Sequence, residues 1–476
     1  MLVPVLVFLC MVTSVVSSLG APLIPTIAAA DHVSLASAQW SLTIALLVGA
    51  LATPTMGRLG DGPRRRAVIL GALAAVTVGG VLAALPLSFA WLVAGRALMG
   101  MGLGLTPLAM ATARDSLSGE RSRSTIALLS VTTVIGVGLG YPITGLITTV
   151  FGFRSAFWFG AAVTGIALVA AWRVIPNSPR AGHRLDVLGG LLLGGGLAAL
   201  VLGLSEEVSW GWTSPKLLGA GLLALALLAG WVVQELRTEH PLIDLSLLRN
   251  RTVLTADVTG LLGGLGMYLL ISVVIRYVQT PRSAGYGFGT SVVVAGLVLL
   301  PFSIASITAS RVAPMIARRT SPDLVLPAGC AIFVVATLTF ALARAHLWEV
   351  FVVMAVAGLG VGCTFAALPG LIVRSVPPEE TGSAMSFNQV LRYVGSAIGS
   401  ALSATILAAH TPHRRVLPLD SGYRSVALLG CGVLAVTAVV SFLLPRTGVT
   451  FDRVLVEETI ADAVPYDEPP RQRAVR

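Results

Sequence analysis

The sequence predicts an all-α protein that crosses a membrane many times. Of its 476 residues, 55% are hydrophobic and 11% are charged, and the mean hydropathy is +0.87. A soluble chain of this length would need a larger share of polar residues for its surface. Apolar stretches of about 20 residues recur along the chain, and each is long enough to cross a bilayer as a helix. These stretches do not alternate between apolar and polar residues, as 222–233 (LLALALLAGWVV) illustrates, so they predict helices and not a β-barrel.

We expect fourteen membrane-spanning helices. Their approximate ranges are 2–22, 38–56, 67–86, 89–111, 125–149, 155–175, 186–204, 217–235, 252–275, 289–310, 324–343, 349–371, 383–407 and 424–444. The N-terminal stretch lacks the basic residues that precede the apolar core of a signal peptide, so we interpret it as the first spanning helix. The basic leader that usually precedes a first helix is missing as well, which leaves a start further upstream open.

The distribution of Lys and Arg predicts the orientation in the membrane. With both termini in the cytoplasm, 22 of the 32 basic residues lie in cytoplasmic segments, eight lie in outer segments, and Arg96 and Arg392 lie within helices. This bias follows the positive-inside rule. The net charge of +10 is then explained by loops beside an acidic membrane surface, and we expect no nucleic-acid partner. We expect a multi-pass protein of the cell (plasma) membrane that contacts lipids, with a monomer as its default state.

An internal repeat indicates two similar halves. GLGLT at 102–106 is matched by GVGCT at 360–364, and each pair of glycines lies in a helix that runs inward to a cytoplasmic loop with Arg and acids. Parallel repeats of this kind are typical of transporters. The predicted layout is an N-terminal six-helix half (1–175), two inserted helices (186–235), a C-terminal six-helix half (252–445) and a disordered cytoplasmic tail (446–476).

The turn GRLGDGPRRR, at 57–66, is the most specific motif in the chain. Its residues Gly57, Asp61, Arg64, Arg65 and Arg66 resemble the signature Gly-x-Leu-x-Asp-Arg-x-Gly-Arg-Arg of the major facilitator superfamily. The aspartate can cap a helix N-terminus and attract neighbouring arginines. The resemblance implies that this turn braces a cytoplasmic gate, and the alternative is an ordinary positive-inside loop.

The fourth predicted helix contains a charge within the bilayer, in GRALMGMGLG (95–104). An arginine there is costly, so Arg96 is a functional candidate. The superfamily has an Arg in this helix that is linked to proton transfer, and the alternative is a structural Arg that hydrogen-bonds helix ends. The glycines at 100, 102 and 104 predict close helix packing.

The fifth predicted helix resembles the Gly-Pro-rich antiporter signature of the superfamily. The match lies in GVGLGYPITG and includes Gly136, Gly140, Pro142 and Gly145. Glycine and proline bend and soften a helix, which allows it to rock. The alternative is simple packing of helices.

The segment between the halves resembles the fourteen-spanner drug:proton antiporter branch of the superfamily. The connector ELRTEHPLIDLSLLRNR (235–251), Asp186 at the start of the seventh helix and Trp210-Gly211-Trp212 all match that branch. The resemblance implies a major facilitator fold in which two extra helices separate two six-helix halves. It also implies a secondary transporter that exports hydrophobic drugs or other lipophilic compounds in exchange for protons.

Proton coupling needs a titratable group that reaches the substrate path, and Asp257 is our candidate. Burial favours the protonated form of a carboxyl group, so a buried aspartate can bind and release a proton. The alternative is an interfacial aspartate paired with Arg249 or Arg251. In SFNQVLRYVG, Asn388, Gln389 and Arg392 put polar groups at mid-membrane, where we expect them to face the cavity because exposure to lipid would be expensive.

Other classes of function have less support in the sequence. Lys216, the single lysine, has no P-loop context, which argues against ATP hydrolysis, and the chain contains neither HExxH nor GxSxG. We expect no enzyme, no cofactor and no metal, and we interpret His410 and His413 as part of an ordinary loop. Export of a physiological lipid, siderophore or natural product, uptake in place of export, and a non-transporting sensor stay open.

Overall fold

The structure of the chain is a computed structural model. It describes residues 1–19, 23, 26–27, 30–33, 35–60, 62–177, 186–211, 213–238, 245–319, 322–377, 380–412 and 417–443. Asp61, residues 239–244 of the connector 235–251 and the tail 446–476 lie outside the described residues. We call residues 1–175 the N-terminal half and residues 252–445 the C-terminal half.

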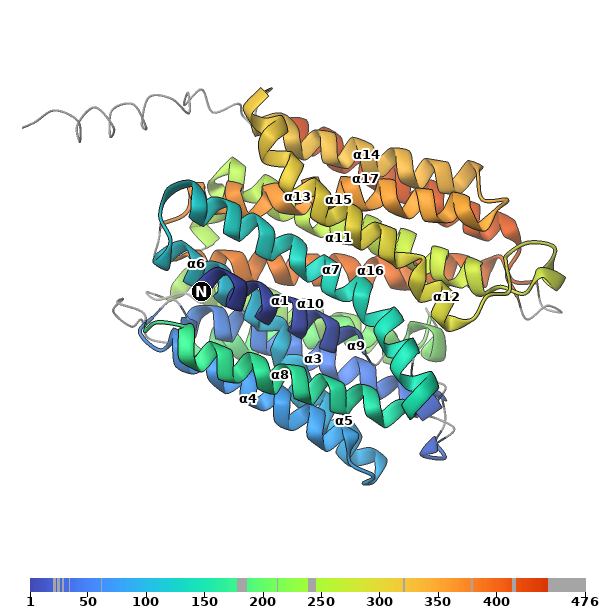
Figure 1. The fold of residues 1–476 in the computed structure, drawn as a ribbon, viewed down its shortest axis with the longest axis horizontal. Helices are drawn as coiled ribbons and strands as arrows, with labels where there is room; N and C mark the ends of the chain where they lie inside the picture. The colour runs from blue at the N-terminus through green and yellow to red at the C-terminus, as the bar shows by residue number, and fades with distance from the viewer. Residues whose placement is uncertain are drawn as a thin grey trace, which may run out of the picture. The chain divides into compact units, whose positions relative to one another are not determined.

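The N-terminal half is helical throughout its described residues. Its elements are α1 (Leu2–Ser18), α3 (Leu35–Gly60), α4 (Arg65–Ala84), α5 (Phe89–Gly100), the 3₁₀ turn η2 (Met101–Gly104), α6 (Leu105–Ser116), α7 (Gly119–Phe151) and α8 (Phe153–Val174). Helix α1 packs on α7 and α8, and α4 packs on α5 and α8 (Figure 1).

The C-terminal half is also helical. Its elements, with the 3₁₀ turn that precedes it, are η3 (Leu245–Arg249), α11 (Arg251–Gln279), η4 (Arg282–Ala284), α12 (Val292–Leu297), α13 (Leu299–Arg319), α14 (Pro322–Leu342), α15 (Leu347–Ser375), α16 (Thr381–Ala409) and α17 (Asp420–Phe442). Helix α11 packs on α16 and α17, and α15 packs on α13 and α14. The halves meet where α7 contacts α13 and α15 and where α3 and α6 contact α16; we call this contact the seam.

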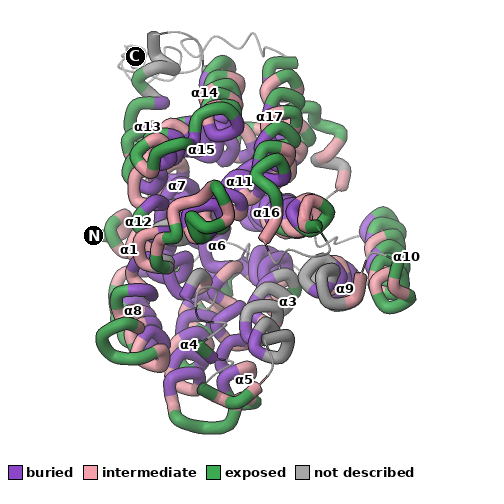
Figure 2. Tube along the Cα trace, turned by 90° about the vertical axis from the view of Figure 1, so that its right-hand side faces the viewer, coloured by how far each residue is buried: buried purple, intermediate pink, exposed green. Residues whose placement is uncertain are grey.

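Two further helices, α9 (Val187–Trp210) and α10 (Pro215–Arg237), lie between the halves in the sequence. Figure 2 shows α9 beside α3 and α16, with the more exposed α10 outside it. The Trp231 ring of α10 lies 6.1 Å from the Phe387 ring of α16, and Gly194 of α9 packs against Leu51 of α3. The pair therefore contacts both halves at one edge of the seam.

Side-chain caps and glycine set several helix boundaries. The Asp186 carboxylate accepts a hydrogen bond from the Gly189 amide at 2.9 Å at the start of α9, and Asn250 Oδ1 accepts one from the Thr252 amide at 2.9 Å at the start of α11. Such caps satisfy amides that lack a partner in the first helical turn. Gly152, at φ +83°, joins α7 to α8 in a backbone conformation that side chains disfavour.

Ten helices among the described residues are long and apolar enough to cross a membrane. This number is lower than the fourteen that we expected from the sequence. The other four expected segments fall in α1, α3, α7 and α9, whose described apolar parts are shorter or less continuous. The protein is an all-helical multi-pass membrane protein, and the larger number of crossings stays a prediction.

The repeated glycines pack helices together, as expected. A Cβ atom on Gly104 would lie 2.9 Å from the Met56 sulfur of α3. In the matching segment of the C-terminal half, a Cβ atom on Gly360 would lie 2.7 Å from the Phe333 amide of α14, and one on Gly362 would lie 2.6 Å from the Ser306 carbonyl oxygen of α13. Small residues allow the backbones to approach closely in both halves.

The closest helix pair in the C-terminal half is α11 with α16. Gly260 and Gly264 on α11 face α16, while Gly395 and Gly399 on α16 face α11. Both pairs are four residues apart, the spacing of the GxxxG packing motif. Gly395 lies against the Leu261 carbonyl group, where a side chain has no room.

We predict that Gly395→Leu destabilises the protein strongly. The leucine would force α11 and α16 apart, and overpacking costs about 1–3 kcal/mol or more. We expect a loss of monodisperse protein in size-exclusion chromatography, or a melting temperature lower by about 5 °C or more. Gly432→Leu in α17 is the matched control, because nothing lies within 4 Å of a Cβ atom there. Equal melting temperatures for the two variants would contradict this packing.

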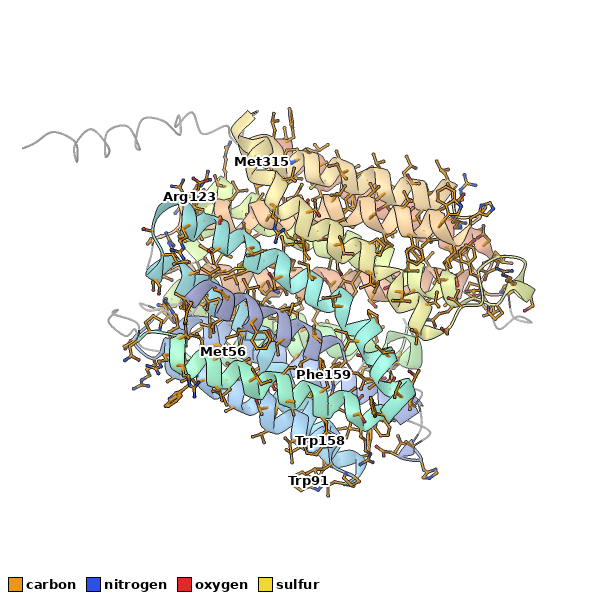
Figure 3. All side chains as sticks on the ribbon, viewed as in Figure 1. Met56, Trp91, Arg123, Trp158, Phe159 and Met315 are labelled. Carbon is orange, nitrogen blue, oxygen red and sulfur yellow. The ribbon has the colours of Figure 1, made fainter. Side chains whose placement is uncertain are left out.

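Exposed tryptophans lie toward the ends of helices in the N-terminal half. Trp91 is 51% exposed and Trp158 is 47% exposed. Figure 3 shows both toward the lower edge of the bundle, at a distance from Arg123 at the start of α7. Half-exposed tryptophans are typical of the interface between membrane and water.

Candidate functional site

Asp257 is buried in the C-terminal half and bonds to α16. It is 3% exposed, and the Asn388 side-chain amide donates to its Oδ1 atom at 3.0 Å and to the Ala256 carbonyl oxygen at 3.2 Å. Arg249 and Arg251 are exposed, and among the described residues neither forms an ion pair with Asp257. The structure therefore brings together two of the residues that we selected from the sequence, and the role of Asp257 stays a prediction.

Arg392 lies one turn along α16 from Asn388 and reaches across the seam. Its guanidinium group donates to Gln389 Oε1 at 2.6 Å and to the Ser130 hydroxyl group of α7 at 3.4 Å. The guanidinium carbon lies 4.5 Å from the centre of the Phe365 ring of α15. Ser130 and Phe365 were not predicted from the sequence, because an uncharged serine and a phenylalanine give no signal in an apolar chain.

Arg96 is fully buried in a separate place, within the N-terminal half. Its Nε atom donates to the Ser41 carbonyl oxygen of α3 at 3.0 Å, and its guanidinium carbon lies 6.0 Å from the Phe157 ring of α8. Its Nη1 and Nη2 atoms have no hydrogen-bond partner among the described residues. The structure shows no contact of Arg96 with Asp257 or with the polar residues of α16.

The turn at 57–66 contributes two contacts across the seam. Gly57 lies so close to α16 that a Cβ atom would stand 2.7 Å from the Ser386 Cβ atom. Arg58 pairs with Glu380, just before α16, at 2.9 Å and 3.0 Å to the two carboxylate oxygens. The Arg58 side chain is 4% exposed, so this ion pair is largely removed from water.

The arginines of the same turn have different surroundings. Arg65 is buried and pairs with Asp115 at the end of α6, and Arg66 donates to the Trp172 carbonyl oxygen at 2.6 Å. Arg64 is exposed at the start of α4. Asp61 lies outside the described residues. These contacts hold the turn to its own half, whereas Arg58 and Gly57 connect it to the other half.

Arg114, near the end of α6, makes further contacts across the seam. Its guanidinium group donates to the Val373 carbonyl oxygen at 2.8 Å and to the Val376 carbonyl oxygen at 3.2 Å, and it also bonds to the Thr381 hydroxyl group. These acceptors lie at the end of α15 and the start of α16. We did not select Arg114, Arg58 or Glu380 from the sequence as seam contacts.

The Gly-Pro segment of α7 is buried at the seam. Gly136 packs on α1, where a Cβ atom would lie 2.8 Å from the Met11 carbonyl oxygen. Gly145 packs on α12, where a Cβ atom would lie 3.3 Å from a methyl carbon of Val293. Gly140 and Pro142 are buried between them, within a helix that runs on past the proline. Helix α7 thus touches both halves.

The predicted histidine pair is only partly described. The His410 ring nitrogen Nδ1 lies 2.8 Å from the Ile406 carbonyl oxygen, and Nε2 lies 3.5 Å from the Ser425 hydroxyl group. His413 lies outside the described residues.

The fold and its buried polar residues define the class: an all-helical membrane protein with a buried aspartate, Asp257, in its C-terminal half and a buried arginine, Arg392, that reaches across the seam. The sequence profile of the Major Facilitator Superfamily matches residues 6–400 and 257–454, and the chain belongs to this superfamily. It is therefore a membrane transporter and not an enzyme.

Individual relatives share this assignment. A "Multidrug resistance protein B homolog" from Mycobacterium tuberculosis is 28% identical over 391 residues, which cover 79% of this chain and 70% of the relative. The "Tetracenomycin C resistance and export protein" of Streptomyces glaucescens is 28% identical over 393 residues, with the same coverage. The solved structure of the human organic anion transporter MFSD10 (TETRAN) matches with a TM-score of 0.62 at 16% identity, over 92% of this chain and 98% of that one, and this likeness concerns the fold alone.

Proposed function

We propose that this chain exports hydrophobic drugs or other lipophilic compounds in exchange for protons, by alternating access. The observation that carries the proposal is the buried bond between Asp257 and Asn388, one turn from an arginine that reaches the other half. An acid in such a place can bind a proton when the path opens to one side and release it to the other.

The roles of the other residues follow from where they lie. Asn388 on α16 bonds to the proton-binding position, Asp257 on α11, and Gln389 and Arg392 follow Asn388 within one turn of α16. Arg96 is a second buried cation, and in this proposal it interacts with a proton or a substrate in the N-terminal half. Gly57, with the arginines 64–66 and Asp61, forms the cytoplasmic gate motif, in which Gly57 contacts the opposite half while Arg65 and Arg66 hold the turn to its own half. Pro142 and the glycines of α7 let this helix move against the opposite half.

We propose the fourteen-spanner drug:proton antiporter branch for this chain. Its layout would be two six-helix halves, 1–175 and 252–445, with two inserted helices at 186–235 and a cytoplasmic tail at 446–476. The arginine bias supports cytoplasmic termini in the cell membrane. The position of α9 and α10 beside both halves supports an inserted pair.

Export of a natural product is the second candidate. It is favoured by the relative from Streptomyces glaucescens whose name describes resistance to, and export of, tetracenomycin C. A physiological lipid or siderophore would use the same machinery. A sensor without transport would not require the proton-binding position.

Transport in inverted membrane vesicles tests the proposal. With the lumen made acidic, we expect a lipophilic substrate from a dye and drug panel to enter the lumen while protons leave it, because export in the cell becomes uptake in inverted vesicles. A protonophore should reduce accumulation to the level of vesicles without the protein. Accumulation that survives the protonophore, or that requires ATP, would contradict proton coupling.

A further inference from the structure

The guanidinium group of Arg392 is a buried positive charge without a counter-ion. Arg392 is 6% exposed, and its hydrogen-bond acceptors are the neutral side chains of Gln389 and Ser130. No aspartate or glutamate pairs with it among the described residues, and Asp257 bonds to Asn388 instead. A charge inside the membrane is costly unless another charge or dipole compensates it, so this position favours an anion.

The neighbouring amide provides a second, independent observation. Gln389 is 4% exposed, and its Oε1 atom accepts the bond from Arg392. Its Nε2 atom has no hydrogen-bond partner among the described residues. Tyr393, which follows Arg392, brings its hydroxyl group near the same amide. The Gln389 amide nitrogen carries two N–H bonds, and the Tyr393 hydroxyl group can accept only one of them. A buried donor without an acceptor is unfavourable, and a ligand oxygen would satisfy the other N–H bond.

The geometry points to a binding site for an organic anion: we propose that Arg392 and Gln389 bind the carboxylate of a lipophilic substrate at the seam. A guanidinium group binds a carboxylate with two parallel hydrogen bonds, while the Gln389 amide supplies a further donor. Phe365, whose ring lies under the guanidinium group and is 1% exposed, shields that side of the guanidinium group from water. This inference rests on the proposed function and specifies its substrate class.

Residues from both halves contribute to the proposed site. The contact between Arg392 and Ser130 is 3.4 Å long, which is weak for a hydrogen bond, and a carboxylate would compete with it effectively. Ser130 would then be free to donate its hydroxyl group to the bound anion. Because Ser130 lies on α7 and Arg392 on α16, binding would change as the halves move.

A matched set of fluorescent probes tests the inference. The set is 1-pyrenebutyrate, its neutral methyl ester and the corresponding primary amine, measured by fluorescence binding to the purified full chain and by transport in inverted vesicles. We expect the wild type to bind the acid at least tenfold more tightly than the ester. Arg392→Gln should remove this preference, so that the variant binds the acid and the ester about equally; size-exclusion chromatography and the melting temperature show whether the variant is folded. Gln389→Leu should reduce the preference several-fold.

Two further variants complete the test. Arg392→Lys keeps the charge but not the paired donors, so we expect part of the preference to remain. Arg154→Gln is the control, because this arginine pairs with Asp31 away from the seam and its loss should leave the preference intact. Equal binding of acid and ester by the wild type, or an undiminished preference in Arg392→Gln, would overturn the inference.

The same data separate this inference from the proposed function. Proton-coupled transport of the ester or the amine, with no preference for the acid, would contradict the anion-binding site and still support the proposed function as an exporter. A strong preference for the acid in binding, without proton-coupled transport of any probe, would support the site and contradict the exporter.

Discussion

Asp257→Asn is expected to abolish proton-driven accumulation of substrate while downhill exchange continues. The amide has nearly the shape of the carboxyl group but cannot ionise, so it neither takes up nor releases a proton. Each coupled proton supports about a tenfold concentration ratio per pH unit, which is about 1.4 kcal/mol. In inverted vesicles with an imposed pH gradient, we therefore expect accumulation to fall to the level seen without a gradient.

The control variants separate proton binding from local structure. Asp257→Glu keeps an acid at this position and should retain part of the accumulation. Asn388→Ala removes the amide that bonds to Asp257 but leaves the acid, so it should shift the pH dependence of transport and not abolish the coupling. Full proton-driven accumulation in Asp257→Asn would remove this residue from the coupling role.

The helices could be predicted from the sequence because apolar length sets a membrane span. The ninth expected segment, 252–275, corresponds to α11 at Arg251–Gln279. The fifth, 125–149, corresponds to the longer α7 at Gly119–Phe151. Hydropathy marks only the part of a helix that lies in lipid, and the helix continues into the polar region beyond it.

Breaks within a spanning helix were harder to predict from the sequence. The expected helix at 89–111 is divided into α5, the 3₁₀ turn Met101–Gly104 and α6. The run of glycines indicated close packing, but the way the backbone tightens there depends on α3, which packs against these glycines. Tertiary contacts of this kind have no local signal in the sequence.

Part of the candidate site followed from the sequence and part of it did not. Asn388 and Arg392 are four residues apart, so their common face on a helix is predictable. The bond between Asn388 and Asp257 joins residues that are 131 positions apart, and no pattern in a single sequence indicates it. Buried charges could be found because they are rare in an apolar chain, whereas their neutral partners could not.

In the proposed orientation, with the turn at 57–66 in the cytoplasm, the ion pair between Arg58 and Glu380 should control the balance between the open and closed states of that side. The pair joins residues 322 positions apart across the seam, and the Arg58 side chain is almost fully buried. Breaking a fully buried pair costs about 3–5 kcal/mol, and we expect about 1–3 kcal/mol here because the Glu380 side chain is 20% exposed. Each 1.4 kcal/mol is about tenfold in a ratio of states.

We therefore predict that Arg58→Glu shifts the population toward the cytoplasm-open state by about 5- to 100-fold, and that Glu380→Arg does the same. The double variant, which restores opposite charges in exchanged positions, should recover most of the closed population. Spin labels at the exposed residues Ser124 of α7 and Leu324 of α14, in a background without the four native cysteines, report the distance between the halves at this end.

The nearby pair of Arg65 and Asp115 distinguishes a gate from general stability. Both residues belong to the N-terminal half, so their bond moves with that half and does not oppose its separation from the other. Asp115→Asn should therefore lower the melting temperature without changing the distance distribution between the labels. An equal shift of the distances in Asp115→Asn and Glu380→Arg would show that the contact across the seam has no special part in closing the path, because any loss of charge in this region would then have the same effect.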